Sequence, residues 1–197
     1  MSSSPAIFLD RDGTMIEDVG YLDRLERLML FPYTIDAIRL LNRGGFKVVV
    51  VTSQAGVAHG SVTEDFLGEA HGVITERVAE AGGRIDAFYY CPHHPHAAVE
   101  KYRTECECRK PKPGMILNAA RDLSLDLARS FTVGDRWRDI EMGLAAGTNG
   151  VLVETGYGKT EALRRPAHVP AVPVVANLID ATSLILARAE GRGLRAK

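Results

Sequence analysis

The segment FLDRDGT places two carboxylates, Asp10 and Asp12, directly after a short apolar run. Two residues apart at the end of a strand, these side chains would start on the same face of the chain, and Gly13 would let the backbone turn sharply away. A third carboxylate, Asp135, follows another apolar run in the segment GDRWRD. Carboxylates held close together repel one another unless a cation lies between them, and such an oxygen-rich site suits Mg²⁺.

A second set of residues carries groups that bind phosphate. Thr52 ends the apolar run FKVVVV with a hydroxyl, and the backbone amides of residues 53–56 could face an anion. Arg109 adds a planar guanidinium that could donate two hydrogen bonds to an anion, and Lys110 adds an ammonium charge. Taken singly, each is also explained as a helix cap, a turn residue or a solvated basic pair. Because the two aspartate motifs, Thr52 and the Arg109-Lys110 pair fall at successive predicted strand ends or just beyond them, a shared site is the better interpretation.

The chain's three cysteines lie close to histidines in the stretch 91–108. An odd number of cysteines argues against a disulfide framework, whereas three thiolates and one imidazole form a complete tetrahedral set for structural zinc. His94 and His96 are rival ligands to the histidine that the spacing C-x-H favours. Free buried cysteines with surface histidines are the alternative. The expected zinc ligands are Cys91, His93, Cys106 and Cys108.

Strands and helices must bring these groups together. Continuous apolar runs at 6–9, 46–51, 85–90, 130–133 and 150–153 predict strands buried on both faces of a parallel sheet. Helical patterns predict helices over 34–43, 137–146 and 177–190, and two more that start near Ser61 and at Pro113. Ser61 and Glu64 have the spacing of a capping box. The basic tail after the last helix is expected to fray. This alternation predicts an open, mainly parallel α/β sheet flanked by helices, with ligands beyond the carboxyl ends of its strands.

Length and charge limit the classes of protein. The 197 residues suggest one domain, 1–197, with the zinc loop at about 91–108. A net charge of −1 gives no field that would recruit nucleic acid or anionic lipid. The N-terminus lacks the pattern of a signal peptide, and every apolar run is far shorter than the roughly 18 residues that span a bilayer. We therefore expect a cytoplasmic monomer with no nucleic-acid or membrane partner.

In order and context, the motifs DxDGT, Thr, Lys and GDxxxD resemble those of the haloacid dehalogenase superfamily of phosphatases, over about residues 6–154. The resemblance implies a Rossmann-like sheet and Mg²⁺-dependent hydrolysis. Only about 40 residues separate Asp12 from Thr52, which leaves no room for a separate cap domain. We therefore expect a capless enzyme in which the zinc loop forms a wall of the substrate pocket.

The resemblance also implies roles for the motif residues. Asp10 would attack phosphorus to form an aspartyl-phosphate, and Asp12 would protonate the leaving alkoxide and later activate water. Thr52 and Lys110 would hold the phosphoryl oxygens. Magnesium would be held by Asp10, the backbone carbonyl of Asp12, and Asp135, while Asp139 would either orient metal-bound waters or cap the following helix.

Within the superfamily, the stretches FLDRDGT, GYL, CPHHP, CRKPKPGM and VGDR resemble the zinc-containing phosphatases that remove the 7-phosphate of a heptose bisphosphate. These serve nucleotide-activated heptose and lipopolysaccharide biosynthesis. By this resemblance Arg109 would bind the distal 1-phosphate and Arg136 would contact the sugar phosphate near the metal. The segment Ser53-Gln54-Ala55 departs from the family's usual Asn-Gln-Ser. The implied substrate contacts are Asp18, Val19, Gly20, Tyr21, Thr52, Ser53, Gln54, Ala55, Arg109, Lys110 and Arg136.

Three alternatives remain open at this point. Histidinol-phosphate phosphatases share the motifs and the zinc loop, but their cationic substrate would pair poorly with Arg109. A phospho-accepting receiver domain also clusters aspartates, a threonine and a lysine on a similar sheet, but needs neither an acid/base at Asp12 nor zinc. A zinc-centred nucleic-acid binder would require basic residues interleaved with aromatic ones, which the chain lacks.

Overall fold

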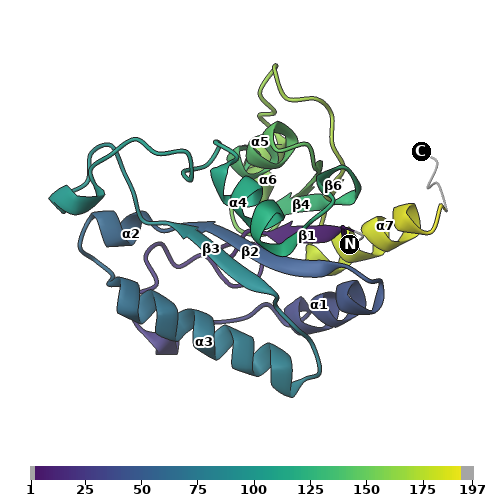
Figure 1. The fold of residues 1–197 in the computed structure, drawn as a ribbon, viewed down its shortest axis with the longest axis horizontal. Coiled ribbons are helices and arrows are strands. Elements are labelled where there is room, and N and C mark those ends of the chain that lie inside the picture. The colour runs from purple at the N-terminus through teal and green to yellow at the C-terminus, as the bar shows by residue number, and fades with distance from the viewer. Residues whose placement is uncertain (1–2, 192–197) are drawn as a thin grey trace.

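The computed structural model describes residues 3–191 and contains a six-stranded, wholly parallel sheet in the order β3-β2-β1-β4-β5-β6 (Figure 1). This confirms the predicted α/β class and five of the strands. The sixth, β6, is two residues long, too short for any periodic pattern to reveal. The strands are β1 (Ala6–Leu9), β2 (Lys47–Ser53), β3 (Ala87–Cys91), β4 (Phe131–Gly134), β5 (Asn149–Val153) and β6 (Val174–Val175).

Helices cover both faces of the sheet (Figure 1). Alternation along β1 shows why: Ile7 and Leu9 pack into one apolar cluster, and Ala6 and Phe8 into another on the opposite face. The first cluster includes residues of α1, α3 and α7, whereas the second includes residues of α4 and α5. The helices are α1 (Thr34–Arg43), α2 (Ala55–Ala58), α3 (Glu64–Glu80), α4 (Gly114–Leu123), α5 (Trp137–Ala145), α6 (Gly158–Ala162) and α7 (Leu178–Ala189).

Two predicted helix starts are wrong by one to three residues. Helix α3 begins at Glu64, and its N-cap is Thr63, whose hydroxyl accepts the N–H of Phe66 at 3.1 Å. The capping box predicted at Ser61 is therefore wrong, because Thr63 supplies the same type of oxygen nearer the helix. Pro113 is the N-cap of α4 and not its first helical residue. The basic tail lies almost wholly outside the described residues.

The strand order places β1 between β2 and β4, so the chain runs to one side of β1 first and to the other side later. In open α/β sheets, ligands bind at such a reversal, beyond the carboxyl ends of the strands. Residues that follow β1, β2 and β4 therefore converge at one edge. Among the described residues, no helix is long and apolar enough to cross a membrane.

The long segment between β3 and α4 contains the 3-10 helix η2 (Glu100–Tyr102) and packs beside α2 and the start of α3. Glu64, the first residue of α3, accepts hydrogen bonds from the hydroxyls of Tyr90 and Tyr102 and pairs with Lys101 at 3.3 Å. The contacts from Tyr102 and Lys101 join the segment to α3.

Candidate active site and metal centres

Three buried carboxylates and one buried lysine meet at the ends of β1 and β4. Asp10 follows β1, and Asp135 follows β4, its neighbour in the sheet. Asp139 comes from the first turn of α5. Carboxylate oxygens of these three residues lie within 4.8 Å of one another. The Nζ of Lys110 lies 2.5 Å from Oδ1 of Asp10 and 2.7 Å from Oδ1 of Asp139.

The charges at this centre show that a cation would fit it. Burial raises the pKa of Asp10 well above its ordinary value, and Lys110 opposes that rise. Burial, followed by repulsion from Asp139, raises the pKa of Asp135 to about 7. One ammonium group thus serves three carboxylates. A divalent cation held by these oxygens would favour the ionised forms of the carboxylates, so the donor set fits Mg²⁺.

Glycines allow the backbone to close around Asp135. Gly13 has a φ of +84°, and a Cβ at this position would lie 2.4 Å from Oδ2 of Asp135. A Cβ at Gly156 would lie 2.2 Å from the same oxygen. The N–H of Tyr157 donates to that oxygen at 2.8 Å. The sharp turn expected after DRD is therefore confirmed, and its purpose is the close approach of two loops to one carboxylate.

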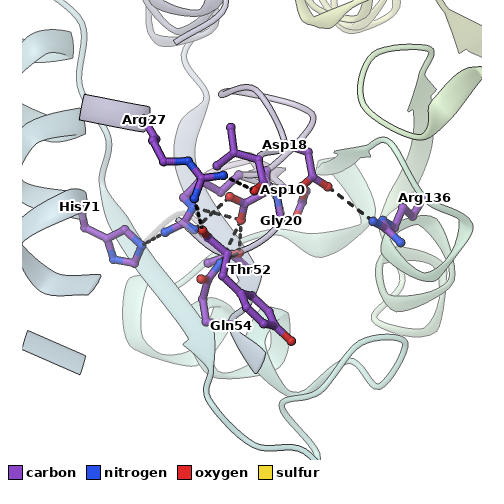
Figure 2. A network of polar contacts seen from close by, with 12 residues as sticks. Asp10, Asp18, Gly20, Arg27, Thr52, Gln54, His71 and Arg136 are labelled. Carbon is purple, nitrogen blue, oxygen red and sulfur yellow. Dashed lines mark hydrogen bonds and ion pairs between the residues drawn. The ribbon is translucent and has the colours of Figure 1, made fainter. Parts of the chain in front are cut away.

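Asp12 has different neighbours from Asp10. Its Oδ2 accepts hydrogen bonds from Gln54 Nε2 at 2.9 Å and from the Thr52 hydroxyl at 3.4 Å (Figure 2). Arg11 contacts both oxygens of the Asp12 carboxylate. Asp12 therefore lies outside the three-carboxylate group, and its side chain is held toward the end of β2. Of the two roles expected for Asp139, helix capping is observed: its Oδ2 accepts the N–H of Arg136 at 3.1 Å.

A cavity of about 260 Å³ opens above these groups. It brings together every residue expected to contact substrate except Val19, whose carbonyl instead accepts a hydrogen bond from Arg27 at 2.7 Å. The Ser53 hydroxyl is buried and has no partner among the described residues, so a ligand oxygen could satisfy it. The lining residues are Asp10, Asp12, Asp18, Gly20, Tyr21, Thr52, Ser53, Gln54, Ala55, Arg109, Lys110, Arg136, Arg138 and Tyr157.

Arg138 and Tyr157 belong to this lining and were not predicted. The guanidinium of Arg136 lies over the Tyr157 ring, 3.5 Å from its centroid. It also contacts Asp18 at 3.4 Å (Figure 2). Arg138 is exposed and forms no side-chain ion pair or hydrogen bond within residues 3–191. Its position in GDRWRD, two residues after Arg136, does not show that it faces the cavity. Tyr157 could have been found from its place just beyond β5.

The four expected zinc ligands form one cluster. Their ligand atoms all lie within 4.8 Å of one another. Nδ1 of His93 is 3.4 Å from Sγ of Cys108, and Sγ of Cys106 is 3.5 Å from Sγ of Cys91 and 3.2 Å from Sγ of Cys108. Tetrahedral zinc with Zn–S bonds of about 2.3 Å separates its sulfur ligands by about 3.8 Å, so the cluster needs little adjustment to hold the ion.

The rival histidines point elsewhere. His94 lies beside His59, with ring centroids 4.9 Å apart, and its Nδ1 accepts the N–H of His96 at 3.1 Å. The cluster is linked to the pocket through Arg109, whose Nη1 donates to the carbonyl of His93 at 2.9 Å. Arg109 also lines the cavity and has no carboxylate partner among the described residues. No described residue of the loop 91–108 itself lines the cavity, so the expected wall consists of Arg109 and Lys110, which directly follow the loop.

A parallel sheet with these carboxylates and a buried lysine at its switch point has the features of the haloacid dehalogenase-like hydrolases. The family model described as HAD-hydrolase-like matches residues 107–181. The D-glycero-β-D-manno-heptose-1,7-bisphosphate 7-phosphatases of Yersinia pestis and Escherichia coli K12 are 44% and 45% identical to the chain over 78% of its length, which covers 82% and 81% of theirs. The chain belongs to the family of these phosphatases.

Solved structures agree with this assignment. The D,D-heptose 1,7-bisphosphate phosphatase of B. bronchiseptica, crystallised with magnesium and phosphate, is 31% identical, with a TM-score of 0.83. The comparison covers 93% of this chain and 99% of that one. A putative HAD-like phosphatase from Mesorhizobium loti is 32% identical, with a TM-score of 0.81, and covers 99% of this chain and 90% of that one. The resemblance to haloacid dehalogenase phosphatases expected from the sequence is confirmed.

Proposed function

We propose that the chain removes the 7-phosphate of D-glycero-D-manno-heptose 1,7-bisphosphate by way of an aspartyl-phosphate, in nucleotide-activated heptose biosynthesis. The observation that carries the proposal is the composition of one cavity. It joins Asp10 and Lys110 to the guanidinium groups of Arg109 and Arg138, which have no carboxylate partner within residues 3–191. Such a cavity suits a substrate with a second phosphate. The names of the family members compared above support the same substrate.

The residues divide the reaction between them. Lys110 holds Oδ1 of Asp10, which leaves the other oxygen to attack phosphorus. As the P–O bond to the sugar breaks, Asp12 gives its proton to the leaving alkoxide. Asp12 then takes a proton from the water that attacks the aspartyl-phosphate, which releases inorganic phosphate and restores Asp10. Thr52 and Lys110 contact the phosphoryl oxygens as charge shifts across them.

The two metals have separate purposes. Magnesium would be held by Asp10, the backbone carbonyl of Asp12, and Asp135; when bound, it offsets the repulsion between the anionic nucleophile and the anionic substrate. Zinc would be held by the four-residue cluster of the loop 91–108, where it would be structural. Asp139 would hold the Lys110 ammonium group in place through an ion pair additional to the one with Asp10.

Arg109 and Arg138 would bind the distal 1-phosphate from two different elements. Arg109 is held by the zinc loop through the carbonyl of His93, and Arg138 belongs to the first turn of α5. Each guanidinium group can donate two parallel hydrogen bonds to the oxygens of a phosphate dianion. Arg136, which is already paired with Asp18 and stacked on Tyr157, would contact the sugar phosphate near the metal.

The test compares kcat/KM of the magnesium- and zinc-loaded protein for both anomers of the heptose bisphosphate and for histidinol phosphate. We expect at least one anomer to be preferred over histidinol phosphate by tenfold or more, because the cationic amine of the latter would face unpartnered guanidinium groups. A tenfold preference for histidinol phosphate would overturn the substrate assignment. Retention of phosphate without repeated release would instead identify a receiver-like domain. A single domain, a monomeric state and a cytoplasmic location stay predictions.

A further inference from the structure

Arg11 lies between the two aspartates of the DRD motif and has no role in the mechanism above. Its side chain is only 1% exposed. Two of its nitrogens clamp the neighbouring carboxylate: Nε donates to Oδ2 of Asp12 at 3.1 Å, and Nη2 donates to Oδ1 at 3.0 Å. This paired contact fixes the plane of the Asp12 carboxylate as well as its position.

The third contact of the Arg11 guanidinium comes from a distant helix. Nη1 lies 3.2 Å from Nε2 of His71, on the second turn of α3 (Figure 2). A guanidinium has only donors, so His71 must accept at Nε2, which requires a neutral ring with its proton on Nδ1. Burial, with Arg11 adding to it, lowers the pKa of His71 to about 3, in agreement with a neutral ring.

His71 is itself held firmly. Its ring stacks on Phe88 of β3, with centroids 4.3 Å apart and planes 19° apart, and meets the edge of Tyr90 at 6.2 Å. The residue is 7% exposed. A buried ring fixed by a strand and a helix therefore decides how the guanidinium is turned, and the guanidinium decides how the Asp12 carboxylate is turned.

We propose that His71 is a positioning residue for the proton transfers of Asp12, acting through Arg11. Without the acceptor at His71, one buried N–H of Arg11 would lose its partner, and the guanidinium would turn to recover one. That rotation would break the paired contact with Asp12. The inference rests on the proposed function in one respect, the role of Asp12 as general acid and base.

The dependence of rate on the leaving group separates this role from a purely structural one. An alkoxide needs a proton as it leaves, whereas the phenolate of 4-nitrophenyl phosphate leaves without one. Because kcat/KM reports the steps up to formation of the aspartyl-phosphate, a misplaced Asp12 would slow only the alkyl ester at this stage. A general weakening of the fold would slow both esters alike.

The experiment compares two substitutions of similar size, His71→Met, which lacks the acceptor, and His71→Gln, whose amide oxygen can replace it. For His71→Met we expect kcat/KM for an alkyl phosphate to fall by about 10- to 100-fold, part of the 10²–10⁴-fold that general acid–base catalysis supplies. For 4-nitrophenyl phosphate the value would stay within about threefold. His71→Gln would keep both values within about threefold of wild type. Ile74→Val, a buried change one turn further along α3, controls for altered packing and would change neither.

Asp12→Asn provides the reference for the leaving-group effect. If Asp12→Asn slows both esters equally, the proton role of Asp12 fails, and the inference fails with it. If Asp12→Asn shows the effect and His71→Met does not, only the inference is overturned. Should His71→Met not fold, Arg11→Lys keeps the buried charge but removes the fork. It would then have to show the same preference for the aryl ester, and equal slowing of both esters would again overturn the inference.

Discussion

Lys110 is buried between two carboxylates, and its side chain is 1% exposed. A buried charge that loses its partner destabilises a protein by about 3–5 kcal/mol. Asp10 and Asp139 therefore have a structural duty besides any chemical one, and a substitution at either must keep a polar group of the same size to be informative. Asparagine meets that condition at Asp10, because Asp139 remains as the partner of Lys110.

Asp10→Asn should abolish turnover, with a fall of at least about a thousandfold, because an amide cannot replace the attacking carboxylate. The melting temperature and the zinc content should stay close to those of the wild type. Steady-state assays, circular dichroism and metal analysis measure these quantities. Asp23→Asn, an exposed change outside the cavity, is the matched control. Retained activity in Asp10→Asn would disprove the nucleophile assignment.

Arg138→Gln should raise KM for the bisphosphate about fivefold, since an exposed guanidinium–phosphate contact contributes about 1 kcal/mol. KM for a sugar monophosphate should not change, because that substrate has no distal phosphate. Arg129→Gln removes the same charge from a surface outside the cavity and should change neither value. An equal rise in KM for both substrates would show that Arg138 acts on the reacting phosphate or on the fold.

Elements are joined at the site by a few polar contacts with large consequences. The segment between β3 and α4 carries three of the zinc ligands, Arg109 and Lys110, and its polar contacts with α3 run from Tyr102 and Lys101 to Glu64. Hydrogen bonds from Tyr102 first, and then from Tyr90, lower the pKa of Glu64 from 4.5 to about 2. Its charged form is thus the one that holds the segment.

Glu64→Gln should destabilise the protein by about 1 kcal/mol at pH 7, the typical loss when hydrogen bonds to a charged, partly exposed group weaken. Because the folded pKa lies below the unfolded one, the contribution of Glu64 is complete above pH 4.5 and disappears as pH falls toward 2. Urea unfolding at pH 7, 4 and 3 measures the difference. Glu69→Gln, an exposed change on the same helix, should have no effect at any pH. A difference that stayed constant down to pH 3 would contradict the prediction.

At the scale of the whole molecule, Arg109 connects the zinc cluster to the substrate cavity. Arg109 follows Cys108 directly and donates to the carbonyl of His93, so two neighbours of the cluster determine where its guanidinium lies. The stability of the loop and the binding of a distal phosphate should therefore change together when the cluster loses its metal.

Cys106→Ser should lower zinc content, lower the melting temperature by about 10 °C or more, and raise KM for the bisphosphate. Metal analysis, thermal unfolding and steady-state kinetics provide the three measurements. Arg109→Gln is the control, because it should raise KM with little change in melting temperature or zinc. Purified wild-type protein with less than half an equivalent of zinc per chain would disprove the zinc assignment itself.

Local patterns in the sequence determined much of this protein. Strand ends followed by polar residues indicated Asp10, Thr52 and Asp135, because a parallel sheet places all such ends at one edge. The short spacings C-x-H and C-x-C indicated the zinc cluster for a similar reason, since ligands so close in the chain need little tertiary structure to meet. The strand order was not predicted, because a strand's own residues do not show which strand lies beside it.

Only the tertiary structure decided which distant residues serve the motif. His71 lies 60 residues from Arg11, and the sequence pattern around it indicates only a buried position of an amphipathic helix. From the sequence, Arg138 would be assigned as a solvated surface charge. The structure shows that it lines the cavity, because the first turn of α5 lies beside it. The pairing of Lys110 with Asp139 likewise depends on α5 starting next to the loop that follows the zinc ligands. Contacts of this kind depend on how whole elements pack, and no spacing along the chain encodes them.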